Sequence, residues 1–274
     1  MKTLGTGGRR LRRVLFATDR SAASRAALIA VSGLAVGGGT EVVVLHVDDR
    51  SRPAEALSLT AGVAGGLISL AVDARSEIRR ADPGGVAAEI AAAAEERGSD
   101  LVVLGSRGRS DLGGLLPGSV GRQVLELVPC PVLLVRAGRR ASGRRRRLLL
   151  TVAGDEDLDG LLRTTAAVAE RDASVLVLHV LAPGAGDFQL APSEQLVQRM
   201  VLGLRRCGVR ARGRAGVHGN AGEIARTAAA YGADLVVMGS RRLPALAALL
   251  SGCVSHGGVR AGDMPVLIGA QEPA

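Results

Sequence analysis

The sequence contains almost no lysine, asparagine or aromatic residue, and each shortage excludes some chemistry. Lys2 is the only lysine, which excludes a Walker-type phosphate lysine or a Schiff-base lysine inside the fold. Aromatic residues make up 1% of the chain, so single-stranded nucleic acid would have little surface on which to stack. Buried cores must therefore be built from the aliphatic residues that dominate the 47% hydrophobic fraction.

Cysteines and long apolar runs are also scarce. Cys130, Cys207 and Cys253 lie far apart, with no CxxC and no paired zinc spacing, which favours inert, reduced thiols. No segment approaches the roughly 20 apolar residues of a membrane span. The first residues show no signal-peptide hydrophobic region, because the apolar run that begins at Val14 is soon interrupted. We therefore expect a cytoplasmic protein with no membrane partner.

Motifs of familiar enzymes are missing as well. The sequence has no Gx4GK[ST], HExxH or GxSxG motif, and no predicted strand is followed by GxGxxG. The histidines show no common metal-ligand spacing, and His46 and His179 fall at matching strand ends, which indicates a shared structural place. The pair Glu95-Glu96 is interpreted as a solvated helix face. We expect no catalytic residue, no metal site and no enzyme activity.

Arginine gives the chain its net charge of +9. Much of the excess lies in two clusters, residues 9–13 and 139–147, and a GC-rich genome explains the preference for arginine over lysine. The clusters are interpreted as a solvated N-terminal arm and a solvated linker. With so few aromatic residues, a nucleic-acid surface is the less favoured interpretation.

The chain repeats itself over a long period. Residues 100–107 recur as residues 234–241, and residues 131–133 recur as 265–267, both at an offset of 134 (234 − 100). Residues 43–47 match 176–180 at an offset of 133 (176 − 43). A period of this length indicates duplicated domains rather than a solenoid. We predict domains at residues 9–138 and 146–270, with the second copy beginning near Leu148.

Each copy alternates short apolar runs with alanine-rich segments. In the first copy these patterns predict strands over residues 11–17, 41–47, 73–81, 100–104 and 132–135. They predict helices over residues 22–36 behind a Ser21 cap, 53–72, 86–97 and 119–128. Nearly continuous apolar strands separated by helices are typical of a parallel sheet covered on both faces, so we predict an α/β fold with two doubly wound domains.

A doubly wound sheet binds ligands beyond the carboxyl ends of its strands, where the strand order reverses. Thr18 and Asp19 follow the first predicted strand, and a glycine-rich turn, residues 105–109, follows the fourth. Glycine lets the backbone approach a phosphate, and Ser119 begins a helix whose N–H groups could bind one. An ordinary βα turn would explain the same glycines, so the residues alone leave both interpretations open.

A longer pattern around this turn is more specific. Gly105-x-x-Gly108, nine residues and then Gly118-Ser119 resemble the G-x2-G-x9-G-(S/T) pattern of ATP-binding universal stress proteins. Residues 14–19 resemble the first strand of that family and its aspartate, residues 45–47 the end of its second strand, and residues 131–135 its last strand. The resemblance spans both copies and identifies the chain as a tandem member of the family.

The resemblance implies a five-stranded parallel sheet of order 3-2-1-4-5 in each copy. It also implies that Asp19 hydrogen-bonds the ribose of ATP, that main-chain groups of Val47 meet the adenine, and that the glycine loop holds the phosphates, with or without Mg²⁺. The implied nucleotide-binding set is Ala17, Thr18, Asp19, Val47, Leu104, Gly105, Gly108, Arg109, Gly118, Ser119 and Val120.

The second copy departs from the pattern where it matters. Ala153 stands in the position of Asp19, although Gly154-Asp155 follows directly. Arg242 stands in the position of Gly108, and Cys253 in that of Ser119. A side chain at 242 would block the approach that glycine allows, and a thiol is a weaker hydrogen-bond donor than a hydroxyl. We interpret the second copy as degenerate and as a structural or pairing partner with weak or no ATP binding.

The resulting hypothesis is a bacterial tandem universal stress protein that binds ATP in its first copy and acts as a nucleotide-responsive stress regulator for an unknown protein partner. The family's use of its last strand implies pseudo-symmetric pairing of the two copies, within a chain or as a homodimer. Two alternatives stay open: a nucleotide-independent interaction protein, and a weak ATPase, for which Asp111 is the only carboxylate in the loop.

Overall fold

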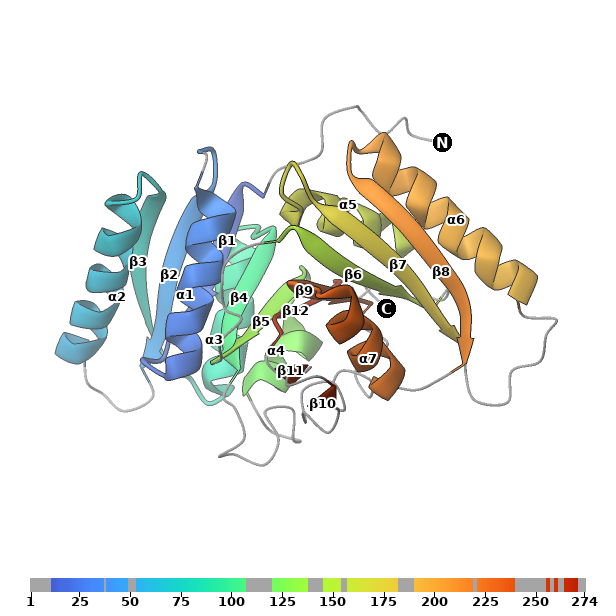
Figure 1. Ribbon diagram of the computed structural model, residues 1–274. Coiled ribbons are helices and arrows are strands. Elements are labelled where there is room, and N and C mark those ends of the chain that lie inside the picture. Colours follow the sequence, from blue (N-terminus) through green and yellow to red (C-terminus); the bar gives the residue numbers. More distant parts are fainter. Residues whose placement is uncertain are drawn as a thin grey trace. The chain divides into compact units, whose positions relative to one another are not determined.

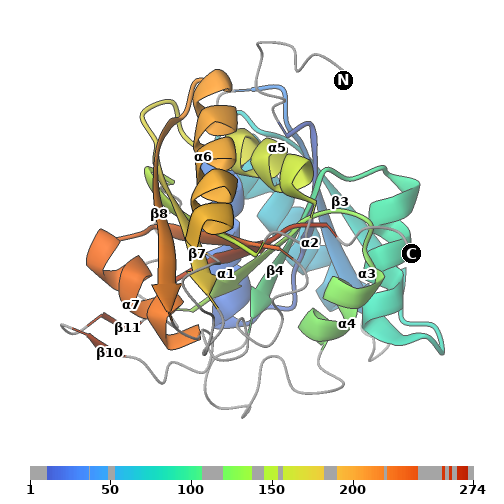
Figure 2. The ribbon, with the colours of Figure 1, turned by 90° about the vertical axis from the view of Figure 1, so that its right-hand side faces the viewer.

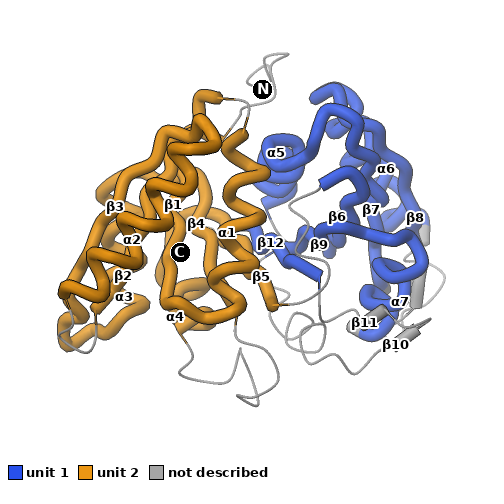
Figure 3. The backbone as a smooth tube through the Cα atoms, turned by 60° about the vertical axis from the view of Figure 1, so that its left-hand side comes forward, with its two compact units in different colours: residues 1–10, 144–269 blue, residues 11–143, 270–274 orange. Residues whose placement is uncertain are grey.

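The computed structural model describes residues 11–36, 38–48, 53–106, 120–137, 145–153, 157–181, 190–218, 221–239, 255–256, 259–260 and 264–270. The chain divides into two compact units, whose continuous parts are residues 11–143 and 144–269 (Figure 3). We call these the N-terminal unit and the C-terminal unit. Within the described residues, no helix is long and apolar enough to cross a membrane.

The N-terminal unit alternates strands and helices along the chain (Figure 1). Its elements are β1 (Arg13–Ala17), α1 (Ala22–Ala35), β2 (Glu41–Asp48), α2 (Pro53–Ile68), β3 (Asp73–Arg80), α3 (Gly85–Glu96), β4 (Leu101–Ser106), α4 (Val120–Leu127) and β5 (Val132–Arg136). The strands pair in the order β3-β2-β1-β4-β5, and every pairing is parallel. The order predicted from the family resemblance is confirmed.

The C-terminal unit repeats this plan. Its elements are β6 (Arg147–Val152), α5 (Leu158–Val168), β7 (Ser174–Leu181), α6 (Leu190–Arg206), β8 (Arg210–His218), α7 (Ala221–Tyr231), β9 (Leu235–Met238), β10 (Ser255–His256), β11 (Val259–Arg260) and β12 (Val266–Ile268). Its sheet has the parallel order β12-β9-β6-β7-β8, which is again 3-2-1-4-5 in the unit's own sequence. The antiparallel pair β10–β11 was not predicted.

Helices cover both faces of each sheet, as the apolar strands require. In the N-terminal unit α1 packs on β4 and β5 and α2 on β2 and β3, whereas α3 and α4 pack together on the opposite face (Figure 2). In the C-terminal unit α6 packs on β7 and β8, and α7 packs on β6 and β7. Because crossovers between parallel strands are right-handed, α5 and α6 share one face and α7 takes the other.

Small residues set the distance between helix and sheet. The buried side of α1 consists mostly of alanines, including Ala23 and Ala27, and it lies against strands whose leucines and valines are almost wholly buried. Ser21 caps the helix as predicted, because its hydroxyl accepts the backbone N–H of Ser24 at 3.0 Å. The predicted second helix ends at Ile68 rather than at residue 72.

Asp100, which directly precedes β4, links that strand to the start of β1. Asp100 Oδ2 accepts the backbone N–H groups of Arg12 and Arg13 at 2.8 and 2.9 Å, and the Asp100 N–H donates to the Arg13 carbonyl at 2.8 Å. The backbone of residues 12 and 13 is therefore fixed to the sheet, while both arginine side chains are exposed, in agreement with their interpretation as solvated.

The same aspartate contact recurs in the C-terminal unit. Asp234 Oδ2 accepts the N–H groups of Arg146 and Arg147 at 3.1 and 3.0 Å. Arg145 is buried, and its Nε donates to the Val168 carbonyl at 2.7 Å. Burial lowers the pKa of the Arg145 guanidinium, although a nearby glutamate opposes this. Residues 145–147 thus belong to the unit's framework. The interpretation as solvated linker was wrong for the buried Arg145, whereas the side chains of Arg146 and Arg147 are exposed.

Candidate functional site

The end of β1 is held in place from three sides. The Thr18 N–H donates to the Leu45 carbonyl at 2.9 Å, which continues the β1–β2 ladder by one residue. The buried Thr18 hydroxyl lies 2.6 Å from the Ser24 hydroxyl on α1. His46 Nδ1 donates to the Thr18 carbonyl at 2.8 Å. Because both its main chain and its side chain are engaged, Thr18 fixes where the following residues leave the sheet.

Asp19 occupies the turn between β1 and α1, and it is exposed. Its Oδ1 accepts the N–H of Ser21 at 3.0 Å, a side-chain turn that favours the start of a helix. Arg20 has a φ of 68°, in the left-handed region that non-glycine residues seldom adopt. An ion pair between Arg20 Nη1 and Glu55 Oε2 at 2.7 Å helps to hold this strained residue. The carboxylate thus stands at the strand end on a constrained turn.

The two histidines occupy equivalent strand positions but make different contacts. His46 Nδ1 donates to the Thr18 carbonyl, whereas His179 is opposite Val152 and its Nε2 lies 3.3 Å from the carbonyl of Ala153, the residue aligned with Asp19. Each histidine still joins the second strand of its unit to the end of the first strand. The predicted shared structural place is confirmed.

Gly105 lies where β4 meets the start of α1. A Cβ on Gly105 would lie 2.4 Å from the Ser24 backbone nitrogen and 2.6 Å from the Ala23 carbonyl carbon. Since real contacts of this kind are a full ångström longer, only glycine fits here. The first glycine of the motif therefore has a packing requirement of its own, and its part in nucleotide binding stays a prediction.

The structure brings part of the predicted set together. Ala17 is opposite Leu104 in the β1–β4 register and opposite Leu45 on its other side, two residues before Val47. Val47 is buried near the end of β2, and Val120 is the exposed first residue of α4. Four further predicted residues lie outside the described residues: Gly108, Arg109, Gly118 and Ser119.

One contributor was missed by the sequence analysis. Ser24 is buried on α1 and contacts Thr18 through its hydroxyl and Gly105 through its backbone. The available signal was a serine three positions after the Ser21 cap, on the alanine side of the helix. A polar residue on an apolar helix face needs a buried partner, and the end of β1 supplies it.

The C-terminal unit presents a different strand end. Ala153 follows β6, so the residue directly after this strand carries no carboxylate. Arg242, Gly252 and Cys253 lie outside the described residues, and the degeneracy of the second motif stays a prediction. Among the described cysteines, Cys130 is buried and free. Burial, assisted by the Asp100 charge, raises its pKa to about 12, so this thiol stays protonated and inert.

Two sets of five parallel strands in the order 3-2-1-4-5 define a doubly wound α/β protein. The sequence profile of the universal stress protein family matches residues 10–136 and 144–268. The chain therefore belongs to the universal stress protein family, as a tandem two-domain member.

Individual relatives agree with this assignment. The chain is 50% identical over 48 residues to the universal stress protein YxiE of Bacillus subtilis, a match that covers 18% of this chain and 32% of that protein. It thus spans about a third of this curated relative. The structure of a universal stress protein from Archaeoglobus fulgidus superposes with a TM-score of 0.73 at 18% identity, over 96% of this chain and 99% of that one. A Pseudomonas aeruginosa protein of unknown function gives a TM-score of 0.58 at 18% identity, over 94% and 92%. At these identities the two structures show a shared fold alone.

Proposed function

We propose that the N-terminal unit binds ATP at the carboxyl ends of β1 and β4, and that the protein acts as a nucleotide-responsive regulator. The observation that carries this proposal is the reversal of strand order between β1 and β4, at the edge where Asp19 leaves the sheet. Open α/β sheets bind their ligands at this topological position.

The contacts of Asp19 suit a ribose ligand. Its Oδ1 is engaged by the Ser21 N–H, which orients the carboxylate on its turn. The side chain is exposed, so a carboxylate oxygen can accept ribose hydroxyl groups, as the family resemblance implies. Because hydrogen bonds to a charged acceptor are the stronger ones, Asp19 is the residue that we expect to contribute most among those described.

The phosphates would lie on the other side of the switch point. The motif that resembles the family's phosphate loop leaves β4 at Gly105 and ends at Ser119, directly before α4. Glycines at 108 and 118 would let backbone N–H groups approach the anion, and the N-terminus of α4 would add its favourable dipole. Mg²⁺ would accompany the phosphates rather than occupy a dedicated protein site.

Regulation rather than turnover is the proposed role. Asp19 supplies the carboxylate of the exposed β1–α1 turn, where its Oδ1 accepts the Ser21 N–H. A carboxylate that positions a ribose is remote from the γ-phosphate and cannot act as a general base there. Occupancy would be read by a protein partner, or through pairing of the two copies.

Isothermal titration calorimetry with ATP on the full chain tests the proposal. We expect about one ATP per chain for wild type, and loss of binding for Gly118→Val, whose side chain would enter the phosphate loop. Asp19→Asn keeps an acceptor for the Ser21 N–H but removes the charge, so we expect affinity to fall about tenfold or more without loss of fold.

Gly252→Val provides the matched control, since residue 252 corresponds to residue 118 in the second copy. This variant should bind ATP like wild type. If Gly252→Val abolished binding and Gly118→Val did not, the nucleotide would lie in the C-terminal unit and the assignment would be wrong. No binding to wild type, after removal of any co-purified nucleotide, would favour a nucleotide-independent interaction protein. Rapid phosphate release would instead support the ATPase alternative.

A further inference from the structure

The edge strand of the C-terminal unit carries arginines on every second residue. Arg210, Arg212 and Arg214 are exposed on β8 and, because side chains alternate along a strand, share one face. The intervening residues face α6, since a Cβ on Gly213 would lie 2.1 Å from the Val197 side chain. We call the three residues the arginine row.

The equivalent strand in the N-terminal unit balances its charges. On β3, Arg75 pairs with Glu41 at 2.6 Å. Arg79 pairs with Glu77 at 2.7 Å and holds the Glu96 carboxylate through two bonds of 3.1 and 2.5 Å. Glu96 stays exposed, as predicted, while it forms this ion pair. Arg75 and Arg79 thus each have an acidic neighbour.

The strand registers show what changed between the copies. Glu41 is opposite Asp73 and Ser174 is opposite Arg210, so Arg75 corresponds to Arg212 and Glu77 corresponds to Arg214. Across the described part of the C-terminal unit, no carboxylate forms an ion pair with the arginine row. The row thus presents charge of one sign at a sheet edge.

Near Arg210, hydrogen bonds within the protein already engage the groups at the sheet edge. Arg210 donates to the Asp172 carbonyl, and Arg205 donates to the Ala211 carbonyl from Nε and Nη2 at 3.1 and 2.9 Å. Arg212 lies over the ring of Tyr231, 5.2 Å from its centroid. The edge available for pairing therefore begins at Arg212.

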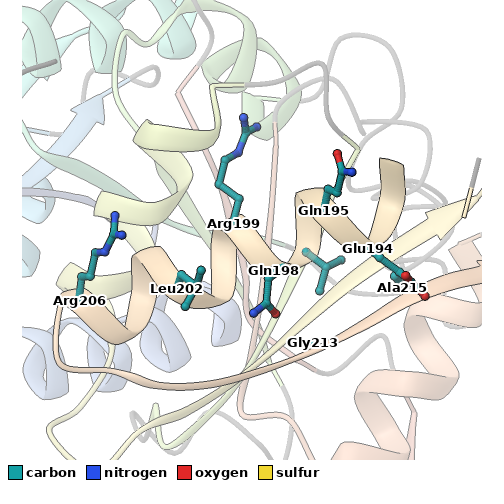
Figure 4. Close-up of a pocket in the computed structure, with 9 residues that line it drawn as sticks. Glu194, Gln195, Gln198, Arg199, Leu202, Arg206, Gly213 and Ala215 are labelled. Carbon is teal, nitrogen blue, oxygen red and sulfur yellow. The ribbon is translucent and has the colours of Figure 1, made fainter. Parts of the chain in front are cut away.

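A groove runs beside this edge on the α6 side (Figure 4). It has a volume of about 830 Å³ and lies between α6 and the residues of β8 that face it. Leu202, 42% exposed, gives it an apolar patch, flanked by Gln198 and Arg206. The small residues Gly213 and Ala215 line its strand side, and Val197 packs closely on Gly213.

We propose that β8 is a docking edge for an extended acidic segment of a partner protein, added as a further strand. Its backbone would pair with β8 from residue 212 onward, a recognition mode in which main-chain hydrogen bonds supply affinity and alternate side chains supply specificity. Acidic side chains would face Arg212 and Arg214, about 7 Å apart along the strand. The apolar side chains between them would enter the groove beside Leu202.

Other occupants fit less well. A second copy pairing through its own β8 would set arginines opposite arginines, which is unfavourable for cross-strand neighbours. Single-stranded nucleic acid would need aromatic platforms, whereas the ring of Tyr231 is covered by Arg212 and its hydroxyl is hydrogen-bonded to Ser174 at 2.9 Å.

Fluorescence anisotropy of a labelled peptide with alternating glutamate and valine, titrated with the full chain at pH 7, tests the proposal. Wild type should bind it. The double variant Arg212→Glu/Arg214→Glu should bind at least about tenfold more weakly, because two attractive cross-strand pairs become repulsive. Arg212→Glu alone should weaken binding, whereas Arg75→Glu, the same charge change at the matched edge of the N-terminal unit, should not.

A second peptide separates strand addition from simple charge attraction. Methylation of alternate backbone nitrogens leaves its charge intact and removes the donors that a strand needs, so binding should be lost. Equal binding of the methylated peptide, or equal losses for Arg75→Glu and Arg212→Glu, would overturn the proposal. So would an oligodeoxythymidine probe that binds more tightly than the peptide and depends on the same arginines. Circular dichroism of each variant checks that the fold is intact.

Discussion

Replacing Gly105 by alanine should destabilise the N-terminal unit, quite apart from any effect on nucleotide binding. The added Cβ would lie 2.4 Å from the Ser24 nitrogen and 2.6 Å from the Ala23 carbonyl carbon, against an ordinary contact distance of at least 3.4 Å. Both neighbours are backbone atoms of α1, so no side-chain rotation can relieve the overlap. The helix start must move by about 1 Å from β4.

The magnitude follows from what that movement disrupts. Overpacking of a close-packed core costs about 1–3 kcal/mol, and displacement of α1 would also stretch the buried contact between the Ser24 and Thr18 hydroxyls, 2.6 Å long. We expect a loss of about 2–3 kcal/mol, a large part of the 5–15 kcal/mol that is typical of a domain. The unfolding equilibrium would shift by roughly 30- to 150-fold.

Thiol labelling can report on this unit alone. Cys130 is buried in the N-terminal unit, so in a background of Cys207→Ser and Cys253→Ser its modification by a thiol reagent marks the opening of that unit. Labelling across a urea series would give the unfolding midpoint for wild type and for Gly105→Ala.

Gly62→Ala is the matched control. Gly62 lies within α2, where a Cβ would meet nothing within 4 Å, so alanine should stabilise by about 0.5–1 kcal/mol through its helix propensity. If Gly105→Ala were as stable as wild type while Gly62→Ala behaved as expected, the packing argument for Gly105 would be refuted.

Two further predictions concern the framework. Asp100→Ala should destabilise the N-terminal unit by about 1–3 kcal/mol, because two backbone N–H groups lose their acceptor. Asp234→Ala should destabilise the C-terminal unit by a similar amount. Urea unfolding of each variant measures the loss, and an unchanged stability would show that water replaces the carboxylate. Arg79 lowers the pKa of Glu96 below its ordinary value of 4.5, so the stability that this pair adds is present above that value and is lost as the pH falls through the lowered pKa. Glu96→Gln should therefore flatten the decline of the urea midpoint in acid, and an unchanged decline would contradict the role of this pair.

Much of the fold could be predicted because its signals are local. The buried strands are nearly continuous valine and leucine, and the helix after Ser21 combines a side-chain cap with an alanine face. The end of α2 was misplaced because Leu70, Ala71 and Val72 remain apolar while the backbone turns back towards β3, and Ala71 adopts a φ of 59°. Apolar content alone cannot distinguish a last helical turn from a turn that leads into a strand.

The site was only partly readable because its contacts join distant segments. Asp19 could be placed at a strand end from sequence pattern, but the packing constraint on Gly105 depends on the approach of α1 to β4, which no local pattern encodes. The burial of Arg145 was missed for the same reason. Its guanidinium donates to the Val168 carbonyl, 23 residues away in the sequence.

Comparison of the two units separates residues that hold the fold from residues that do something else. A contact that the fold itself requires should occur in both copies, and the aspartate contact does, at Asp100 and at Asp234. Asp19 differs, because its aligned position in the C-terminal unit is Ala153, although the turn into α5 carries acids of its own and Asp157 caps that helix. The fold therefore does not require a carboxylate at the position of Asp19 itself. By the same reasoning, the fold does not require the unbalanced charge of Arg214, because Glu77 occupies the equivalent position on β3. Substitution of either residue should change binding before it changes stability.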